Sequence, residues 1–141
     1  MHIHCACYLI GMTVVNDEHS LVRRWREILA LHATTVISLD QELKPFGLGA
    51  SDFEVLDILI QSDSGDGRGL YVHQMADLFH LSQSALSRLV ARLERDGLVT
   101  RKMCDTDRRR VRVMLTDAGR DRHGEALPVQ RGVLRKRLAA D

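Results

Sequence analysis

The chain has 141 residues, the size of one ordinary domain. It is 45% apolar and 28% charged, a composition that can bury a hydrophobic core and excludes an intrinsically disordered chain. The net charge is only +1, but residues 1–80 carry 5 Lys/Arg against 11 Asp/Glu, a balance of −6, whereas residues 81–141 carry 15 against 8, a balance of +7. This asymmetry favours a polyanion as the partner of the second half.

The cysteine count and the N-terminal residues bear on where the protein works. Cys5, Cys7 and Cys104 are too few, and odd in number, for a disulfide framework, which favours a reducing compartment. No stretch approaches the roughly 18 apolar residues that span a bilayer. The start, "MHIHCACYLIGM", lacks the basic region and cleavage site of a secretory signal. We therefore expect a cytoplasmic protein with a disordered leader at residues 1–16, in which Met12 is an alternative start.

The first periodic segment predicts a long helix over residues 17–46. Pro45 and the following "GLGA" end the pattern. Apolar side chains recur there at helical spacing: Leu21, Trp25, Ile28, Leu29, His32, Val36, Leu39 and Leu43. A helix of this length with a continuous apolar stripe often packs against a second chain. Residues 17–46 are therefore predicted to be an N-terminal dimerisation helix.

Residues 47–80 predict two shorter helices separated by a turn. Ser51 followed by Glu54 three residues later is a capping-box pattern and predicts a helix that starts at Ser51. Residues 62–69, "SDSGDGRG", are typical of a flexible turn, and residues 70–72, "LYV", are prone to form a strand. A short helix follows over residues 73–79. Its predicted inward-facing side chains are Met75, Leu78 and Phe79.

The next helix has clear start and stop signals. Ser82 lies where an N-cap is expected, and Gly97 lies where a helix ends. The predicted core face consists of Leu86, Leu89, Val90 and Leu93. The remaining faces carry Gln83, Ser84, Ser87, Arg88, Arg92 and Arg95. The first turns of this helix are therefore small and polar.

After Gly97 the hydrophobic period changes from helical to alternating. "LVTRKM" and "VRVML" flank residues 105–110, which predicts a β-hairpin with an arginine-rich tip. Thr116 is expected to cap a last helix over residues 117–141. Four residues are expected to weaken or kink that helix: Gly119, Gly124, Pro128 and Gly132. The predicted fold is mainly α with a small β-wing, in which residues 47–116 form a winged helix-turn-helix.

Two short helices joined by a tight turn and followed by a basic hairpin fit duplex DNA. The major groove admits one α-helix, which enters with short or hydrogen-bonding residues at its N-terminal end. Arginine enters a narrow minor groove because the negative potential is concentrated there, and an aspartate two positions earlier can hold its guanidinium in one rotamer. The predicted DNA-contacting residues are Ser82, Gln83, Ser84, Ser87, Arg88, Asp107, Arg108, Arg109 and Arg110.

The stretch "LSQSALSRLVARLERDGLVTRKMCDTDRRRVRVMLTDAG" resembles the core of a MarR-type regulator. The specific signature is Asp-x-Arg followed by Leu-Thr-x-x-Gly, present here as Asp107, Arg109, Leu115, Thr116 and Gly119. The resemblance covers about residues 17–137. It implies a homodimeric transcription factor, most often a repressor, that binds a palindromic double-stranded operator.

The resemblance also implies roles for individual residues. Arg109 would enter the minor groove with Asp107 orienting it, while Arg108, Arg110 and Arg92 would meet the DNA backbone. The residues implied to face major-groove base edges are Gln83, Ser84, Ser87 and Arg88. Members of this family normally have a further long helix that would begin near Asp141, so an incomplete C-terminal dimerisation helix and a weakened dimer are expected.

The family also often binds a small aromatic or acidic effector in a crevice beside the dimerisation helices. Trp25, His32 and Phe53 are the candidate lining residues, and core or dimer packing is the alternative role for each. Cys104, which has basic neighbours, is a candidate redox-sensing thiol.

A ligand-responsive DNA-binding regulator has three alternatives. One is a thiol-based sensor of the same fold that acts through Cys104. Another is a winged-helix protein-interaction module without DNA read-out. The third is an enzyme, which is disfavoured because phosphate-loop, nucleophile-elbow and zinc-protease motifs do not occur. The leader "HIHCAC" is too cramped for a standard zinc site, so no metal or other cofactor is expected.

Overall fold

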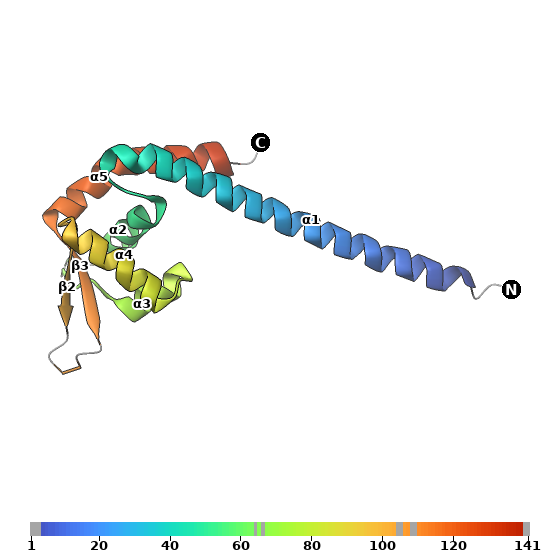
Figure 1. The fold of residues 1–141 in the computed structure, drawn as a ribbon, viewed down its shortest axis with the longest axis horizontal. Coiled ribbons are helices and arrows are strands. Elements are labelled where there is room, and N and C mark those ends of the chain that lie inside the picture. The colour runs from blue at the N-terminus through green and yellow to red at the C-terminus, as the bar shows by residue number, and fades with distance from the viewer. Residues whose placement is uncertain (1–3, 64, 66, 104–105, 108–109, 140–141) are drawn as a thin grey trace. The chain divides into compact units, whose positions relative to one another are not determined.

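The computed structural model describes residues 4–63, 65, 67–103, 106–107 and 110–139, and their side chains from residue 17 onward. Helices and a small three-stranded antiparallel sheet make up the fold, which confirms the predicted class (Figure 1). The chain divides into two compact units, Met1–Ile37 and Ser38–Asp141. Among the described residues, no helix is long and apolar enough to cross a bilayer.

The first helix, α1, is longer than its periodicity predicts. It spans His4–Leu43, so it begins before the predicted start at residue 17 and includes residues 4–16 of the leader that was predicted to be disordered. Proline does not occur between residues 4 and 43, and adding residues to an existing helix costs far less than starting one. A 3-10 helix, Lys44–Phe46, follows and stops at Gly47, whose φ is +70°.

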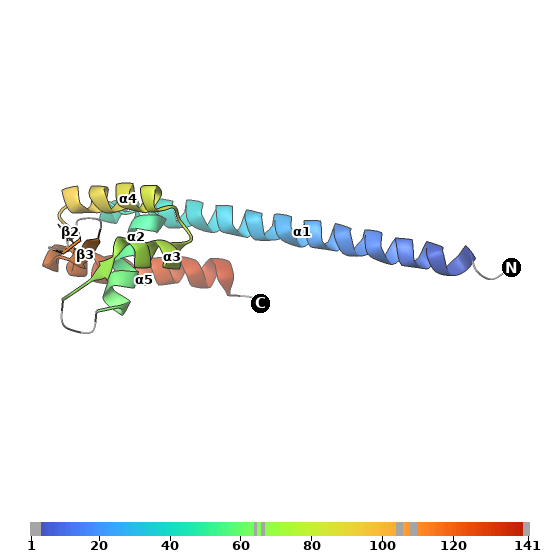
Figure 2. The same cartoon turned by 90° about the horizontal axis from the view of Figure 1, so that it is seen from below.

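The last turns of α1 belong to the second unit, which begins at Ser38. Leu39 and Leu43 are buried there in one core with side chains from every other element. Within this unit α2 (Ala50–Gln61) packs against α5 (Asp117–Leu138), and α3 (Val72–Phe79) packs against α4 (Gln83–Arg95) (Figures 1 and 2). The largest fully buried side chains include Phe53, Leu56, Met75, Leu86, Leu93 and Val113.

Two details of α2 and α3 correct the sequence prediction. The N-cap of α2 is Gly49 and not Ser51, because the Asp52 carboxylate accepts the Gly49 N–H at 2.7 Å. Asp52 is the third helical residue after Gly49. Its carboxylate therefore fills the capping-box position that the sequence prediction gave to Glu54. In α3, Met75 is buried as predicted, but Leu78 is 56% exposed, so the prediction that it faces inward was wrong. The buried face of α3 instead includes Ala76.

The sheet has strand order β1-β3-β2, with β1 at Leu70–Tyr71, β2 at Val99–Met103 and β3 at Val111–Leu115. The hairpin of β2 and β3 confirms the predicted wing, and its central residue, Val113, is fully buried. Gly69 immediately before β1 has φ +67°, and a Cβ added there would lie 1.9 Å from the Val113 carbonyl oxygen. Glycine therefore lets β1 approach β3 closely enough to pair.

The last helix, α5, runs unbroken from Asp117 to Leu138 although Pro128 lies inside it. Thr116 caps it as predicted: its Oγ1 accepts the Gly119 N–H at 3.0 Å and donates to the Gly97 carbonyl at 2.6 Å. Pro128 removes one backbone donor, but the face of α5 that packs on the core is intact. Its buried side chains include His123, Ala126 and Gln130. Tertiary packing thus holds a helix that local propensity weakens.

Candidate nucleic-acid interface

The proposed recognition helix, α4, is built as its sequence indicates. Ser82 is the N-cap, and its Oγ accepts the Ala85 N–H at 3.1 Å. Gly97 follows the helix with φ +76°, the left-handed conformation that favours glycine. The four predicted core side chains are all buried: Leu86, Leu89, Val90 and Leu93. This burial fixes which side of α4 faces away from the core.

The polar side of α4 is exposed along its first two turns. Five predicted DNA-contacting residues are exposed there: Ser82, Gln83, Ser84, Ser87 and Arg88. They lie at positions i, i+1, i+4 and i+5 of the helix with the cap residue before them, so they share one face. The structure therefore brings these predicted residues together at the N-terminal end of the helix.

Arg92 lies farther along α4 and makes an ion pair with Asp52 of α2. Its side chain is 52% exposed, whereas that of Asp52 is 9% exposed. Asp52 also accepts the Gly49 N–H, so one carboxylate caps α2 and connects it to α4. Sequence reasoning assigned Arg92 to the DNA backbone only, and nothing in the local sequence signals a partner forty positions away.

A second ion pair joins α4 to the wing. Glu94 accepts the side chain of Arg101 on β2 at 2.9 and 3.2 Å, and it accepts the Arg101 backbone N–H at 3.1 Å. The hydrogen bond from the Arg101 side chain lowers the pKa of Glu94 from its ordinary value. This contact connects β2 to α4, and it too was missed by the sequence analysis.

The tip of the wing is described only in part. Asp107 and Arg110 are exposed, and the Arg110 N–H donates to the Asp107 carbonyl at 3.0 Å, which closes a turn. Arg108, Arg109 and Cys104 lie outside the described residues. The predicted roles of those three side chains therefore stay predictions.

Aromatic and basic side chains gather at the base of the wing, a cluster that the sequence did not indicate. The Arg112 guanidinium donates to the Tyr71 hydroxyl at 2.7 Å, and its carbon is 4.8 Å from the ring centroid. The guanidinium carbon of Arg110 is 5.3 Å from the same centroid. His73 stacks on the ring with a centroid separation of 5.6 Å and an interplanar angle of 16°.

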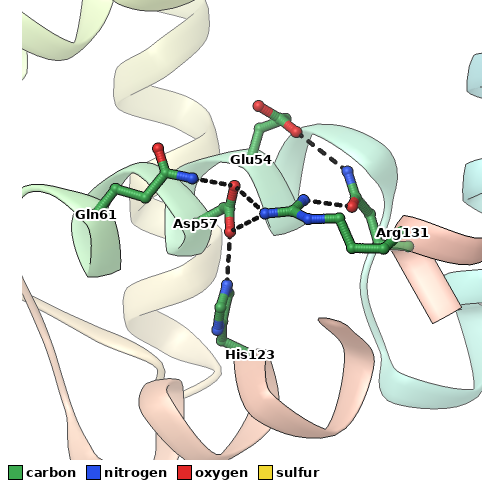
Figure 3. Close-up of polar contacts among 6 residues, drawn as sticks. Glu54, Asp57, Gln61, His123 and Arg131 are labelled. Atoms are coloured by element: carbon green, nitrogen blue, oxygen red, sulfur yellow. Dashed lines mark hydrogen bonds and ion pairs between the residues drawn. The ribbon is translucent and has the colours of Figure 1, made fainter. Parts of the chain in front are cut away.

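A buried polar network connects α2 with α5 and therefore holds the winged domain on its C-terminal helix. Figure 3 shows three side chains directed at the Asp57 carboxylate. The His123 Nε2 lies 2.8 Å from Oδ1, the Arg131 Nη2 donates at 3.1 and 3.2 Å, and the Gln61 Nε2 donates at 3.0 Å. Asp57 and His123 are only 7% and 5% exposed.

The same network extends to Glu54. Gln130 donates to Glu54 at 3.5 Å and accepts from Arg131 at 2.6 Å. Burial, together with the charge of Asp57, raises the pKa of Glu54, and the charge of Arg131 opposes that rise. The residues of this network are separated by up to 76 positions in the chain, so no spacing pattern could have revealed it.

Comparisons with known proteins identify the fold built around α4. Residues 46–110 match the MarR family. The structure is similar to that of AbsC, a MarR family transcriptional regulator from Streptomyces coelicolor, with 30% identity, a TM-score of 0.72, and 82% of this chain and 76% of AbsC covered. The chain belongs to the MarR family. This confirms the resemblance found on residues 81–119.

Two further structures extend the comparison. Sco3205, a MarR family transcriptional regulator from Streptomyces coelicolor solved in complex with DNA, is 28% identical with a TM-score of 0.75, over 86% of this chain and 74% of that one. A mutant of MarR from E. coli, complexed with operator DNA, is 21% identical with a TM-score of 0.71, over 83% of this chain and 81% of that one, and at this identity it supports the fold alone.

The candidate effector residues of this MarR family protein fall in both units. Trp25 and His32 belong to the first unit, where Trp25 is 58% exposed on α1. Phe53 belongs to the second unit and is fully buried, stacked on His123 at 5.1 Å with the Arg131 guanidinium 6.0 Å from its centroid. The burial of Phe53 therefore supports its alternative role, which is core packing.

The described residues contain no group of three His, Cys, Asp or Glu side chains that could hold a metal ion. The side chains of His2, His4, Cys5 and Cys7, the potential ligands of the leader, lie outside the described part of the chain.

Proposed function

We propose that this MarR family protein is a sequence-specific double-stranded DNA-binding transcriptional regulator. Helix α4 enters the major groove with its N-terminal polar face, and the wing lies over the adjacent minor groove. The observation that carries this proposal is the exposed face of Ser82, Gln83, Ser84, Ser87 and Arg88 on a helix whose opposite side is buried. The major groove, about 12 Å wide, accepts such a helix.

The surroundings of α4 support this role. Ion pairs connect the helix to α2 and to β2, and burial of its apolar side holds the polar face in place before DNA arrives. The N-cap at Ser82 leaves backbone N–H groups directed out of the helix, where they suit a phosphate. In the wing, Arg109 is proposed to enter the minor groove and Asp107 to orient it. A structure of Sco3205, which is 28% identical, was solved with DNA bound.

The same proposal includes a homodimer on a palindromic operator. On α1, three apolar side chains at helical spacing are half or more exposed: Leu21 at 60%, Trp25 at 58% and Ile28 at 52%. Exposed large apolar side chains that recur along one face mark a protein interface. A second copy that buries this stripe would form a homodimer with two α4 helices, one for each half-site of a palindrome.

Regulation by an effector is the last part of the proposal. A small aromatic or acidic molecule beside Trp25 and His32 would change the separation of the two recognition helices. Both recognition helices must match their half-sites at once. A small rotation of one recognition helix relative to the other therefore removes most of the contact with the second half-site. The protein is therefore proposed to act as a repressor that its effector releases from DNA.

Fluorescence anisotropy tests the DNA-binding core of the proposal. The wild-type protein is titrated onto a duplex from the intergenic region upstream of its own gene, with a scrambled duplex as competitor and a salt series. Competitor-resistant binding that Arg88→Ala weakens more than tenfold supports the proposal. The matched control is Lys44→Ala, which removes one exposed positive charge outside α4 and the wing. Binding that the scrambled competitor removes completely contradicts sequence-specific read-out.

A further inference from the structure

One tyrosine ring contacts two arginine side chains at the base of the wing. Tyr71 lies in the edge strand β1 and is paired with Arg112 of β3. Arg110 lies directly before β3, which begins at Val111, and its side chain reaches the same ring as that of Arg112. Their guanidinium carbons are 5.3 and 4.8 Å from the Tyr71 centroid, within the range of a cation–π interaction.

The ring itself is held from several directions. The Tyr71 hydroxyl accepts from Arg112 at 2.7 Å, and the Tyr71 backbone N–H donates to Gln74 Oε1 at 3.0 Å. His73 stacks on the ring from the start of α3. Gly69, where any Cβ would clash with β3, keeps β1 close to β3. Tyr71 is therefore a fixed platform and not a freely moving surface side chain.

The two arginines differ in what the ring does for them. Arg112 is partly buried and hydrogen-bonded, so it braces the ring. Arg110 is exposed at the wing turn, and a free arginine there would lose much rotamer freedom when it ordered on a ligand. Contact with the ring restricts Arg110 before any ligand binds, and such preorganisation strengthens binding.

We propose that Tyr71 is a positioning residue for DNA binding, which holds Arg110 in one orientation so that its guanidinium meets a backbone phosphate. Stacking on His73 and strand pairing with β3, together with Arg112, hold the ring in that position. This inference rests on the proposed DNA-binding function. It assigns the tyrosine a role in affinity although the tyrosine need not touch DNA.

The first test uses the free protein and needs no DNA. In the wild type, the Arg110 side-chain Nε–Hε signal should show a ring-current shift and reduced mobility by NMR relaxation, in contrast to the exposed Arg135 of α5. Both properties should disappear in Tyr71→Leu and persist in Tyr71→Phe, which keeps the ring. An Arg110 signal as mobile as that of Arg135 in the wild-type protein overturns the inference, whether or not the leucine variant folds.

The second test measures DNA binding. Tyr71→Leu should weaken binding by about three- to tenfold and reduce the slope of log K against log salt by up to about 0.9, the value of one phosphate contact. Tyr71→Phe should stay within about twofold of the wild type. In Arg110→Ala, adding Tyr71→Leu should cost nothing further, because the tyrosine acts through that arginine.

Additive losses from Tyr71→Leu and Arg110→Ala, with the wild type still binding, overturn this inference and leave the proposed function standing. A wild type that does not bind DNA overturns both. Lys44→Ala is the control for the double-variant comparison. Its effect on the free energy of DNA binding should add to that of Tyr71→Leu, because the two sites are independent.

Discussion

Replacing Asp57 by alanine should destabilise the protein strongly although Asp57 is outside the proposed DNA-binding surface. The substitution removes the acceptor of hydrogen bonds from His123, Arg131 and Gln61. His123 has a side chain that is 6% exposed and loses its partner in the core, which costs about 1–3 kcal/mol. Arg131 is 35% exposed and can be rehydrated, so its loss is discounted to about 1 kcal/mol. The expected total is about 3 kcal/mol.

Urea unfolding followed by circular dichroism measures this loss, at one fixed protein concentration because dimerisation would shift the apparent stability. Asp57→Asn keeps one acceptor oxygen in nearly the same shape and should lose about 1 kcal/mol. Asp77→Ala is the matched control, since Asp77 is an exposed helical aspartate, and it should stay within about 0.5 kcal/mol of the wild type. If the free energy of unfolding of Asp57→Ala equals that of the Asp77→Ala control, the network in Figure 3 does not hold α2 on α5.

Three further outcomes are expected. Gly69→Ala should destabilise the sheet by at least about 2 kcal/mol in urea unfolding, because its Cβ would meet the Val113 carbonyl at 1.9 Å; a neutral result would refute that close approach. Ser82→Ala should cost about 1 kcal/mol in the same assay by removing the N-cap of α4, and no loss would refute the cap. The hydrogen bond from Arg120 lowers the pKa of Asp63 below its ordinary 3.8, so its stabilisation is present above that pH and lost as the pH falls through the lower native value. Thermal melts between pH 2.5 and 6 should therefore show a smaller acid-induced loss in Asp63→Asn than in the wild type, and identical profiles would contradict the pairing.

Features whose causes are local in sequence were predicted well. The cap at Ser82, the four apolar positions of α4 and the stop at Gly97 all follow from neighbouring residues, and each was confirmed. The alternating pattern after Gly97 likewise predicts the hairpin that buries Val113. Periodicity and capping depend on side chains one or two turns apart, so a single sequence contains the information.

Features that depend on distant residues were missed or misplaced. Asp52 caps α2 and also pairs with Arg92, and the second contact is invisible in the local pattern that favoured Ser51 as the cap. Pro128 argues against a continuous α5, yet packing of that helix on the core overrides local propensity. The Tyr71 cluster arises from strand pairing between residues 41 positions apart. Tertiary contacts of this kind become visible only in the folded chain.

Selection of bound duplexes from a random-sequence pool tests the central claim most directly. The wild type should enrich one palindrome whose half-sites are centred about 10 base pairs apart, since two α4 helices read the same face of DNA. Gln83→Ala should change the base preference inside the half-site and leave the spacing unchanged, because that side chain lies on the exposed face of α4. A pool without enrichment, or a preference that Gln83→Ala does not alter, would contradict base read-out by α4.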